Sequence, residues 1–280
     1  MREVKTAEIT RVVAELCLRA NRELPRGLYK ALREAAEKEV SPIGREALRR
    51  LVENAELAAE EGLPVCQDTG MVVVFVELGQ EVHLVGGSLA AAVDEGIRQG
   101  YRRGYLRASV VRDPLLRKNT GDNTPGVIHL NLVPGNRIRV IVAPKGFGSE
   151  NMGGVTMLTP AQGAAGVIDF VVDTVRRAGA NPCPPVIVGI GLGGTMEKAA
   201  LLAKEALLRP IGAPNPAPPL AALEREILAR LNDLGIGPQG LGGRYTAVAV
   251  HLLAYPTHIA GLPVAVNISC HACRYAEQVI

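Results

Sequence analysis

Apolar residues recur at helical spacing in the first part of the chain. They occupy positions i, i+3, i+4, i+7 and i+8 of one stripe: Ile9, Val12, Val13, Leu16 and Cys17. This spacing predicts an amphipathic helix that packs one face into a core. A second helix is predicted over about residues 43–61, because Gly62 and Pro64 follow it as a stop signal. We expect Cys17, which lies on the stripe, to be a packing residue.

Strands are predicted where runs rich in β-branched residues occur. The run MVVVFVEL follows the second helix, and the runs YTAVAVHLLAY and LPVAVNIS lie near the end of the chain. Residues 127–143 contain the runs VIHLNLV and RIRVIVA on either side of a Pro-Gly-Asn turn, which predicts a β-hairpin. Its alternation places His129 on the polar face, where we expect it to be solvated or to face a partner.

Three further helices are predicted, at about residues 160–178, 195–208 and 220–234. The segment RPIGAPNPAPP between the last two is too rigid and too short for a flexible domain linker. Helices therefore come first, over about residues 1–62, and a mixed α/β region follows over about residues 63–280. This order favours an α+β fold in one domain over a regular Rossmann fold.

The composition limits the classes of protein that fit. The chain has 280 residues, of which 48% are hydrophobic, enough for a sizeable core. A net charge of +3 and 3% aromatic residues argue against a nucleic-acid partner. No apolar run approaches the roughly 18 residues that span a bilayer, and the start MREVKTAEIT lacks the apolar core of a signal peptide. We therefore expect a cytoplasmic protein without a membrane partner.

A glycine pattern raises the possibility of a dinucleotide site. Gly189, Gly191 and Gly194 match G-x-G-x-x-G after an apolar run. That site also needs a second parallel strand that ends in an acidic residue about 20 residues further on. The segment RPIGAPNPAPP stands there instead, with no strand pattern and no acid. We favour a glycine-rich turn that allows another group to approach the backbone closely.

Three of the five cysteine positions lie in loops beside predicted strands: Cys66, Cys183, and Cys270 or Cys273. Five scattered cysteines do not form a disulfide framework in a chain of this length. Thiolates on loops at strand ends can converge on an iron-sulfur cluster or on zinc. The spacing alone leaves simple burial equally open. Three thiolates on a 4Fe-4S cluster would leave one iron open as a Lewis acid, which would indicate catalysis rather than electron transfer.

Several long motifs, in order, resemble one enzyme family. They are VCQDTG, NTPGVIHL, PKGFGSENMGG, NPCPPVIVGIGLGGTMEKAALLAK, GIGPQGLGGRYTAVAV and HIAGLPVAVNISCHACR. The chain resembles the alpha chain of two-subunit class I fumarate hydratases and L-tartrate dehydratases from about residue 8 to residue 280. The resemblance implies a 4Fe-4S cluster on three cysteines, matched here by Cys66, Cys183 and Cys270. Cys273 falls where the family needs no ligand, so we expect it to be a packing residue or a bystander thiol.

The resemblance also implies roles for five other residues. Gln67 and Asp68 directly follow the first ligand and would contact substrate, with Asp68 handling a proton or water. Arg107 would clamp a substrate carboxylate, His258 would contact substrate as a catalytic residue, and Gly148 would let the backbone approach it. The sequence alone also fits non-catalytic roles: a turn cap for Asp68, a position at a solvated helix end for Arg107 and a structural role for His258.

The implied activity is reversible hydration of fumarate to malate at the open iron. Dehydration of tartrate is an alternative, and a non-catalytic subunit stabilised by zinc on the same thiolates is a third. In the family a second unit completes the active site. Because this sequence ends at Ile280, ten residues after Cys270, we expect a separate beta subunit and a hetero-oligomer.

Overall fold

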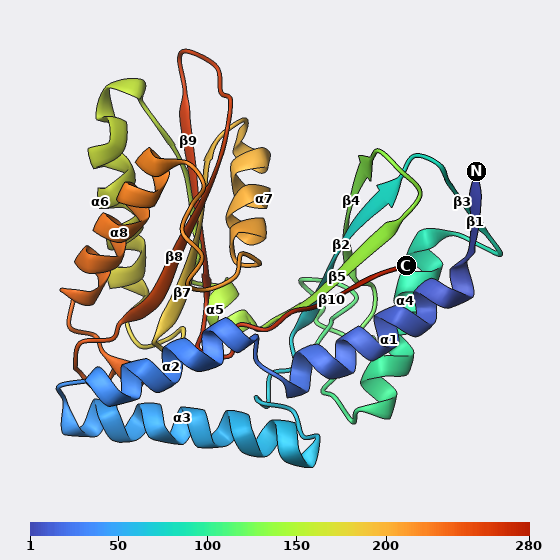
Figure 1. Ribbon diagram of the computed structural model, residues 1–280, viewed down its shortest axis with the longest axis horizontal. Coiled ribbons are helices and arrows are strands. Elements are labelled where there is room, and N and C mark those ends of the chain that lie inside the picture. Colours follow the sequence, from blue (N-terminus) through green and yellow to red (C-terminus); the bar gives the residue numbers. More distant parts are fainter. The chain divides into compact units, whose positions relative to one another are not determined.

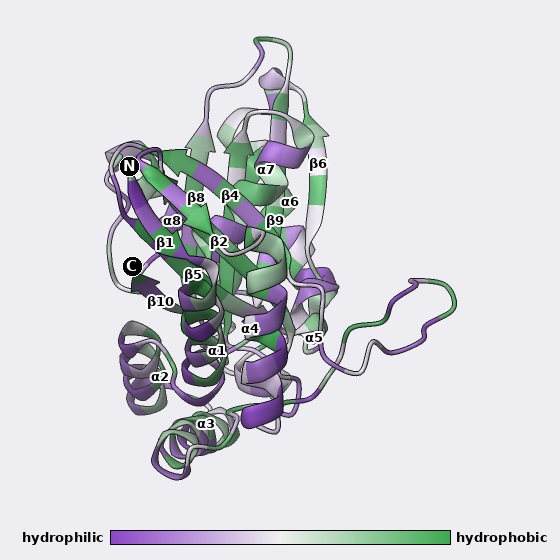
Figure 2. Cartoon of the chain, turned by 90° about the vertical axis from the view of Figure 1, so that its right-hand side faces the viewer, coloured by the Kyte–Doolittle hydropathy of each residue, from purple (hydrophilic) through white to green (hydrophobic).

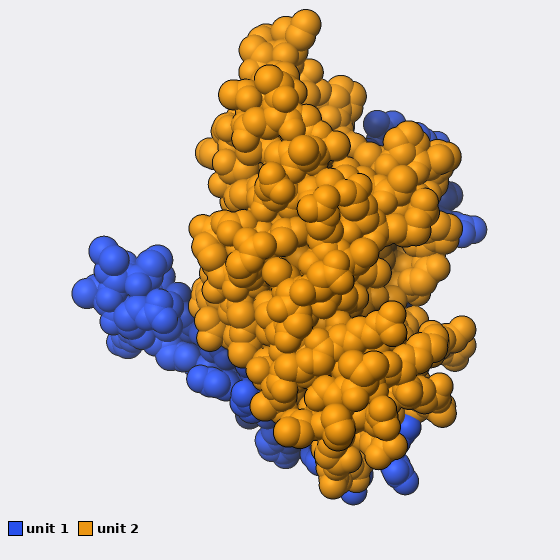
Figure 3. All heavy atoms as spheres, turned by 90° about the vertical axis from the view of Figure 1, so that its left-hand side faces the viewer, with its two compact units in different colours: residues 1–25, 55–147, 274–280 blue, residues 26–54, 148–273 orange.

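The computed structural model describes residues 1–280, and the chain separates into two compact units built from non-contiguous segments. Unit 1 comprises residues 1–25, 55–147 and 274–280, and unit 2 comprises residues 26–54 and 148–273 (Figure 3). None of the helices combines the length and the apolar character that crossing a lipid bilayer requires.

Unit 1 is a four-stranded sheet with two helices packed on one face (Figure 1). The strand order is β10-β5-β2-β4. The strands are β2 (Met71–Gly79), β4 (Val127–Val133), β5 (Ile138–Lys145) and β10 (Ala276–Val279), and the helices are α1 (Thr6–Arg22) and α4 (Leu89–Arg103). The short strands β1 (Arg2–Lys5) and β3 (Val82–Val85) pair in parallel.

Alternation along the central strand of unit 1 builds its core. Val72, Val74 and Val76 of β2 are all buried in one cluster with α1 and α4, as the period of two along a strand requires. In Figure 2 strands β2 and β5 are mostly green, whereas the outward sides of α1 and α4 are purple. Ile9 and Leu16 of the predicted helical stripe are buried in the same cluster.

Unit 2 is a second four-stranded sheet, in the order β6-β9-β7-β8, covered on both faces. Helices α6 and α8 pack on one face and α7 on the other (Figure 1). The strands are β6 (Gly154–Leu158), β7 (Val186–Gly193), β8 (Ala247–Tyr255) and β9 (Leu262–Ser269). The helices are α2 (Arg26–Lys38), most of α3 (Pro42–Glu61), the short α5 (Phe147–Glu150), α6 (Gly163–Ala178), α7 (Met196–Ala206) and α8 (Pro218–Asn232).

The glycines of the G-x-G-x-x-G pattern serve strand–helix packing in unit 2. Gly189 and Gly191 lie inside strand β7, so the predicted glycine-rich turn is wrong at these two positions. A Cβ on Gly189 would lie 2.1 Å from the Ala203 carbonyl oxygen, and one on Gly191 would lie 1.9 Å from that of Ala199. Helix α7 therefore rests directly on β7, and the close approach that the glycines permit is that of a helix backbone.

The predicted hairpin over residues 127–143 is wrong, although both strands exist. Strand β2 lies between them: β4 pairs with β2 in parallel and β5 pairs with β2 antiparallel. The connection from β4 to β5 passes the end of β2, where a Cβ on Gly79 would lie 2.3 Å from the Gly135 carbonyl oxygen. His129 is half-buried and stacks on Phe75 of β2, with ring centroids 5.0 Å apart, rather than standing in solvent.

The other predicted elements and the α+β class are confirmed. The helix predicted at about residues 43–61 is α3, and the three later helices are α6, α7 and α8. The strands predicted from MVVVFVEL, YTAVAVHLLAY and LPVAVNIS are β2, β8 and β9. The short strands β1, β3 and β10 were not predicted, because each has only four residues.

A buried carboxylate fastens the α2–α3 turn of unit 2 to the segment before β8. Glu39 is fully buried, and its oxygens accept the backbone N–H groups of Val40, Ser41, Arg244 and Tyr245 at 2.8 to 3.0 Å. Burial alone would raise the pKa of Glu39, yet these four donors lower it below its usual value.

We expect Glu39→Gln to destabilise the folded chain by roughly 2 kcal/mol at neutral pH, the scale for hydrogen bonds to a buried charged group. Because the pKa of Glu39 is lowered in the folded state, its stabilising contribution is fully present above the pKa of the unfolded chain, about 4.3. This contribution is lost as the pH falls through the lower pKa that Glu39 has in the folded state. Chemical unfolding at pH 7 and near pH 3 measures both effects. Glu37→Gln, at an exposed position of α2, is the control, and equal stability of both variants at pH 7 would contradict this role.

Candidate active site

The motif VCQDTG forms a loop between α3 and β2 in unit 1, as predicted. Cys66 and Asp68 are half-buried and Gln67 is exposed. The Cys66 thiol lies 3.4 Å from Gln67 Oε1, to which it can donate a hydrogen bond. A thiol and two polar side chains are therefore presented together, without burial of the loop backbone in the core.

The Asp68 carboxylate is fixed by two backbone donors. Its Oδ1 accepts the Gly70 N–H at 3.0 Å, and its Oδ2 accepts the Phe147 N–H at 2.9 Å. The first contact is the turn-capping role that the sequence alone suggested. Each carboxylate oxygen has two lone pairs, so the same bonds that orient Asp68 leave it able to accept a proton.

Arg274, which the sequence did not single out, lies beside Asp68 in unit 1. Its Nη2 donates to the Asp68 carbonyl oxygen, while its Nε and Nη1 are buried without a hydrogen-bond partner. A Cβ on Gly146 would lie 3.2 Å from Asp68 Oδ2 and 3.9 Å from Arg274 Nη2, so the cation and the carboxylate are neighbours. Because arginine stays protonated, a buried positive charge stands next to the loop.

Two more buried residues hold the turn that follows Asp68. The Tyr101 hydroxyl lies 2.6 Å from the Thr69 carbonyl oxygen and 3.0 Å from that of Gly70. Burial raises the pKa of Tyr101, which keeps it a donor. Asn123 is fully buried, donates from Nδ2 to the Gly70 carbonyl at 3.1 Å and accepts the Ser109 N–H at 2.8 Å.

The structure joins the segments of Asp68 and Arg107. The hydroxyl of Thr69, the residue after Asp68, donates to the Arg107 carbonyl oxygen at 3.0 Å. The Arg107 side chain is exposed and forms no ion pair within the chain. Its backbone is therefore fixed while its guanidinium stays available to a carboxylate.

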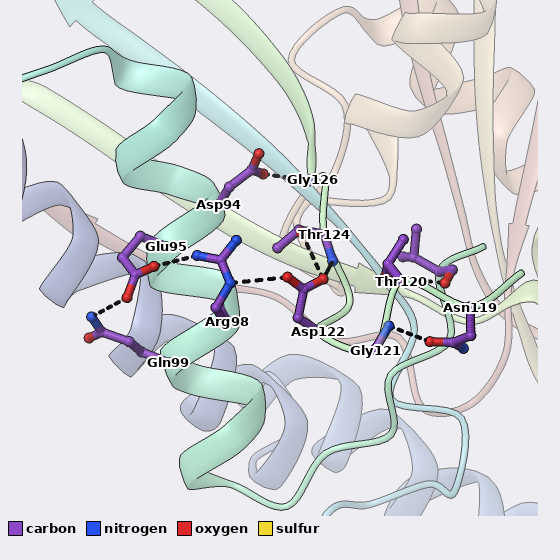
Figure 4. Close-up of polar contacts among 11 residues, drawn as sticks. Asp94, Glu95, Arg98, Gln99, Asn119, Thr120, Gly121, Asp122, Thr124 and Gly126 are labelled. Carbon is purple, nitrogen blue, oxygen red and sulfur yellow. Dashed lines mark hydrogen bonds and ion pairs between the residues drawn. The ribbon is translucent and has the colours of Figure 1, made fainter. Parts of the chain in front are cut away.

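A polar network fastens the segment before β4 to helix α4 (Figure 4). Arg98 donates from Nε to Asp122 Oδ2 at 3.0 Å, and Asp122 Oδ1 accepts the Thr124 hydroxyl at 2.8 Å. Asp94 Oδ1 accepts the Gly126 N–H at 2.9 Å. Partial burial opposes ionisation of Asp122, but the hydrogen bonds from Thr124 and Arg98 lower its pKa to about 2. The carboxylate therefore remains charged at ordinary pH.

Cys183 and Cys270 lie on neighbouring loops of unit 2. Cys183 is exposed before β7, and Cys270 is half-buried directly after β9, which pairs with β7. His271 Nδ1 lies 3.0 Å from the Cys183 carbonyl oxygen, so the two loops touch. The Cys183 backbone has a φ of +53°, a conformation that L-residues rarely adopt and that its surroundings must hold.

Gly148 lies beside the Cys183 loop, on the exposed side of unit 2. A Cβ there would meet only the Asn181 carbonyl oxygen, at 3.7 Å, which is an ordinary contact. Nothing within unit 2 thus requires glycine at this position. The predicted approach of the Gly148 backbone to substrate stays a prediction.

His258 is not brought to the two cysteines. It is exposed in the turn between β8 and β9, whereas Cys183 and Cys270 lie at the opposite end of the same sheet. An eight-residue strand at about 3.3 Å per residue separates the ends by roughly 25 Å. His258 Nδ1 accepts the Ala260 N–H at 3.2 Å, so Nε2 is the ring nitrogen left to donate.

The remaining cysteines pack in the core, as predicted. Cys17 is fully buried in the core of unit 1, and burial raises the pKa of its thiol. Cys273 is buried against the Leu207 carbonyl oxygen at 3.9 Å. The three accessible thiols are therefore those of Cys66, Cys183 and Cys270.

The accessible thiols suit a soft metal centre in their chemistry and in their presentation on loops. Unit 2 presents Cys183 and Cys270 on touching loops, and unit 1 presents Cys66 on its own loop. Within neither unit do three His, Cys, Asp or Glu side chains gather around one point.

Residues 10–279 match the family described as fumarate hydratase (Fumerase). The chain belongs to the fumarate hydratase family. A Methanocaldococcus jannaschii protein, provisionally named L(+)-tartrate dehydratase subunit alpha, is 41% identical over 275 residues, which cover 96% of each chain. The protein named L(+)-tartrate dehydratase subunit alpha in Shigella sonnei is 33% identical over 273 residues, covering 95% of this chain and 89% of its own.

Membership of the fumarate hydratase family sets the class of reaction. A fumarate hydratase adds water to a double bond and a tartrate dehydratase removes water to form one, so both names describe hydro-lyases. The match runs through every motif quoted above, from the Cys66 loop to the Cys270 loop.

Proposed function

We propose that this chain is the cluster-binding alpha subunit of an iron-sulfur hydro-lyase that converts fumarate to malate reversibly. The observation that carries the proposal is the loop of Cys66, where a thiol is followed two residues later by the Asp68 carboxylate, which two backbone donors fix. In a member of the fumarate hydratase family, this arrangement supports a role for Asp68 as a proton acceptor beside the proposed ligand Cys66.

Cys66, Cys183 and Cys270 would hold a 4Fe-4S cluster. When bound, such a cluster supplies one iron without a protein ligand as a Lewis acid for a hydroxyl and a carboxylate. Cys17 and Cys273 are too deeply buried to take part.

In this proposal, residues of unit 1 would bind and orient the substrate. Asp68, held by the Gly70 and Phe147 N–H groups, accepts or returns the proton of the hydration step. Gln67 contacts the substrate from the neighbouring position, and Arg107 clamps a substrate carboxylate with its planar guanidinium. Gly148 in unit 2 gives the substrate room to approach the backbone.

His258 remains a predicted catalytic residue without a neighbouring thiol in unit 2. Its Nε2 suits a donor to substrate. His258 lies at the opposite end of β8 and β9 from Cys183 and Cys270. It can therefore act at the proposed iron only if another surface brings His258 to that iron.

A second candidate is dehydration of tartrate. The names of the relatives at 41% and 33% identity favour it. Tartrate differs from malate by one hydroxyl group, so the same thiolates and the same Asp68 serve both reactions. A non-catalytic zinc subunit would use the same thiols, but it would leave the oriented carboxylate of Asp68 with no role beyond capping its turn.

The chain alone is expected to be inactive even with its cluster, because a beta subunit would complete the carboxylate and proton-transfer groups. The relatives are named as alpha subunits. The test is anaerobic co-expression with the beta subunit, followed by assays on fumarate, malate and tartrate and by metal analysis. Full turnover by the chain alone would refute the need for a partner, and colourless protein with stoichiometric zinc would refute the cluster.

Arg107→Lys is expected to raise the KM for the dicarboxylate by about tenfold, with a smaller change in kcat. Lysine keeps the charge but loses the bidentate contact with a carboxylate. Steady-state kinetics of the assembled enzyme measures both constants. Arg112→Lys, at an exposed position of the same loop region, is the control. An unchanged KM in Arg107→Lys would remove this arginine from the site.

A further inference from the structure

The motif GIGPQGLGG has no role in the activity proposed above, yet it touches both thiol-bearing loops of unit 2. Gln239 lies in its middle, half-buried, with a φ of +55°. One atom of this residue, Nε2, lies 2.7 Å from the Pro184 carbonyl oxygen and 3.2 Å from His271 Nδ1. Pro184 directly follows Cys183, and His271 directly follows Cys270.

The backbone of Gln239 strengthens the contact with the Cys183 loop. Its N–H also donates to the Pro184 carbonyl oxygen at 2.7 Å, so one residue supplies two donors to one acceptor. This geometry depends on the positive φ at Gln239. It also depends on Gly240, where a Cβ would lie 2.3 Å from the Ala180 Cβ, so that the motif packs against the same loop.

His271, on the Cys270 loop, contacts both Gln239 and the Cys183 loop. Its Nδ1 lies 3.0 Å from the Cys183 carbonyl oxygen, which can only accept a hydrogen bond. Without a proton on Nδ1, His271 accepts the second hydrogen of the Gln239 amide, whose first hydrogen goes to Pro184; with the proton on Nδ1, it donates to the Cys183 carbonyl. The carbonyl groups of Cys183 and Pro184 are then both fixed by other segments, which holds Cys183 at its positive φ of +53°.

We propose that Gln239 is a positioning residue that sets the separation of the Cys183 and Cys270 thiols. The inference rests on the proposed cluster, because it concerns how two of its three ligands are held. Groups outside the ligand shell that orient metal ligands commonly change metal affinity by about 10–100-fold when they are removed. Gln239 does this for both loops with one side chain.

Gln239→Gly is the informative variant. Glycine adopts a positive φ without strain and keeps the backbone N–H that binds Pro184, so the fold is expected to keep its thermal stability. Only the side-chain contacts with Pro184 and His271 are lost. Gln239→Glu keeps the length of the side chain but cannot donate to the Pro184 carbonyl. Arg117→Gly, at an exposed positive-φ residue of unit 1, is the matched control.

Two measurements test the proposal. In the reconstituted chain, iron loss to a ferrous chelator is followed together with the electron paramagnetic resonance spectrum. In the metal-free chain, Cd²⁺ binding is followed by thiolate absorption, with Cys183→Ser and Cys270→Ser showing which thiols bind. Both Gln239 variants are expected to lose iron about 10–100-fold faster and to bind Cd²⁺ correspondingly more weakly than the wild type, with Arg117→Gly unchanged.

The outcomes separate this inference from the proposed function. If the wild type assembles no cluster, the proposed function fails, and the Cd²⁺ affinities still decide the role of Gln239. Wild-type iron retention and Cd²⁺ affinity in Gln239→Gly would overturn the positioning role. So would Cd²⁺ binding in the wild type that does not depend on both Cys183 and Cys270. A fall in thermal stability without a change in either measurement would make Gln239 merely structural.

Discussion

Cys66→Ser, Cys183→Ser and Cys270→Ser are each expected to abolish stable assembly of the 4Fe-4S cluster. A serine hydroxyl is a hard and weakly acidic ligand, so it replaces a thiolate poorly on iron-sulfur clusters. These three thiols are accessible on loops beside β2, β7 and β9, and two of the loops touch through His271. Iron and sulfide analysis after anaerobic reconstitution measures the loss.

The control variants are Cys17→Ser and Cys273→Ser, which are expected to keep full iron and sulfide. Both cysteines are buried, so their variants are expected to lose some thermal stability through burial of a hydroxyl. The contrast between thermal stability and cluster content makes the five variants informative. Cluster loss in Cys273→Ser with retention in Cys270→Ser would show that the third ligand is misassigned.

The local elements were predictable because their signals lie within single segments. The stripe of Ile9 to Cys17 gives α1, and the valine-rich run after the Cys66 loop gives β2. Burial of Cys17 followed from its place on that stripe. Periodicity reports which face of an element is apolar, and the cores of both units obey it.

Strand pairing was not predictable from the same signals. The turn between β4 and β5 has the composition of a hairpin, yet β2 lies between the two strands and pairs with both. His129 illustrates the consequence. Its alternation suggested a solvated side chain, but the parallel neighbour β2 places Phe75 against it.

The residues of the candidate site also fall into two groups: those that a local motif indicates, and those that depend on contacts distant in the sequence. Asp68 and Arg107 were proposed from motifs, and the structure joins their segments through Thr69. Arg274, Asn123 and Gln239 went unnoticed because each acts through hydrogen bonds to carbonyl groups far away in the sequence. One weak signal was present for Arg274, a charged residue that directly follows the buried Ala272 and Cys273.

Asp68→Asn is expected to leave the cluster bound but to lower kcat by at least about 10²-fold, the usual effect of removing a positioned acid or base. The amide can still accept one of the two N–H groups from Gly70 and Phe147, so the turn should persist. It cannot take a proton at neutral pH. Turnover of the assembled enzyme, iron content and thermal stability are measured on the same preparation.

The alternative is that Asp68 only caps its turn, and a matched carboxylate tests it. Asp113 also accepts two backbone N–H groups, those of Leu115 and Leu116 at 2.8 and 2.7 Å, in an exposed turn of unit 1. Asp113→Asn therefore neutralises a carboxylate that also caps a turn, away from Cys66, and should leave kcat unchanged. If Asp68→Asn kept near-normal kcat and lost only thermal stability, the fixed carboxylate beside Cys66 would be structural, and the proton acceptor of the hydration step would have to come from elsewhere.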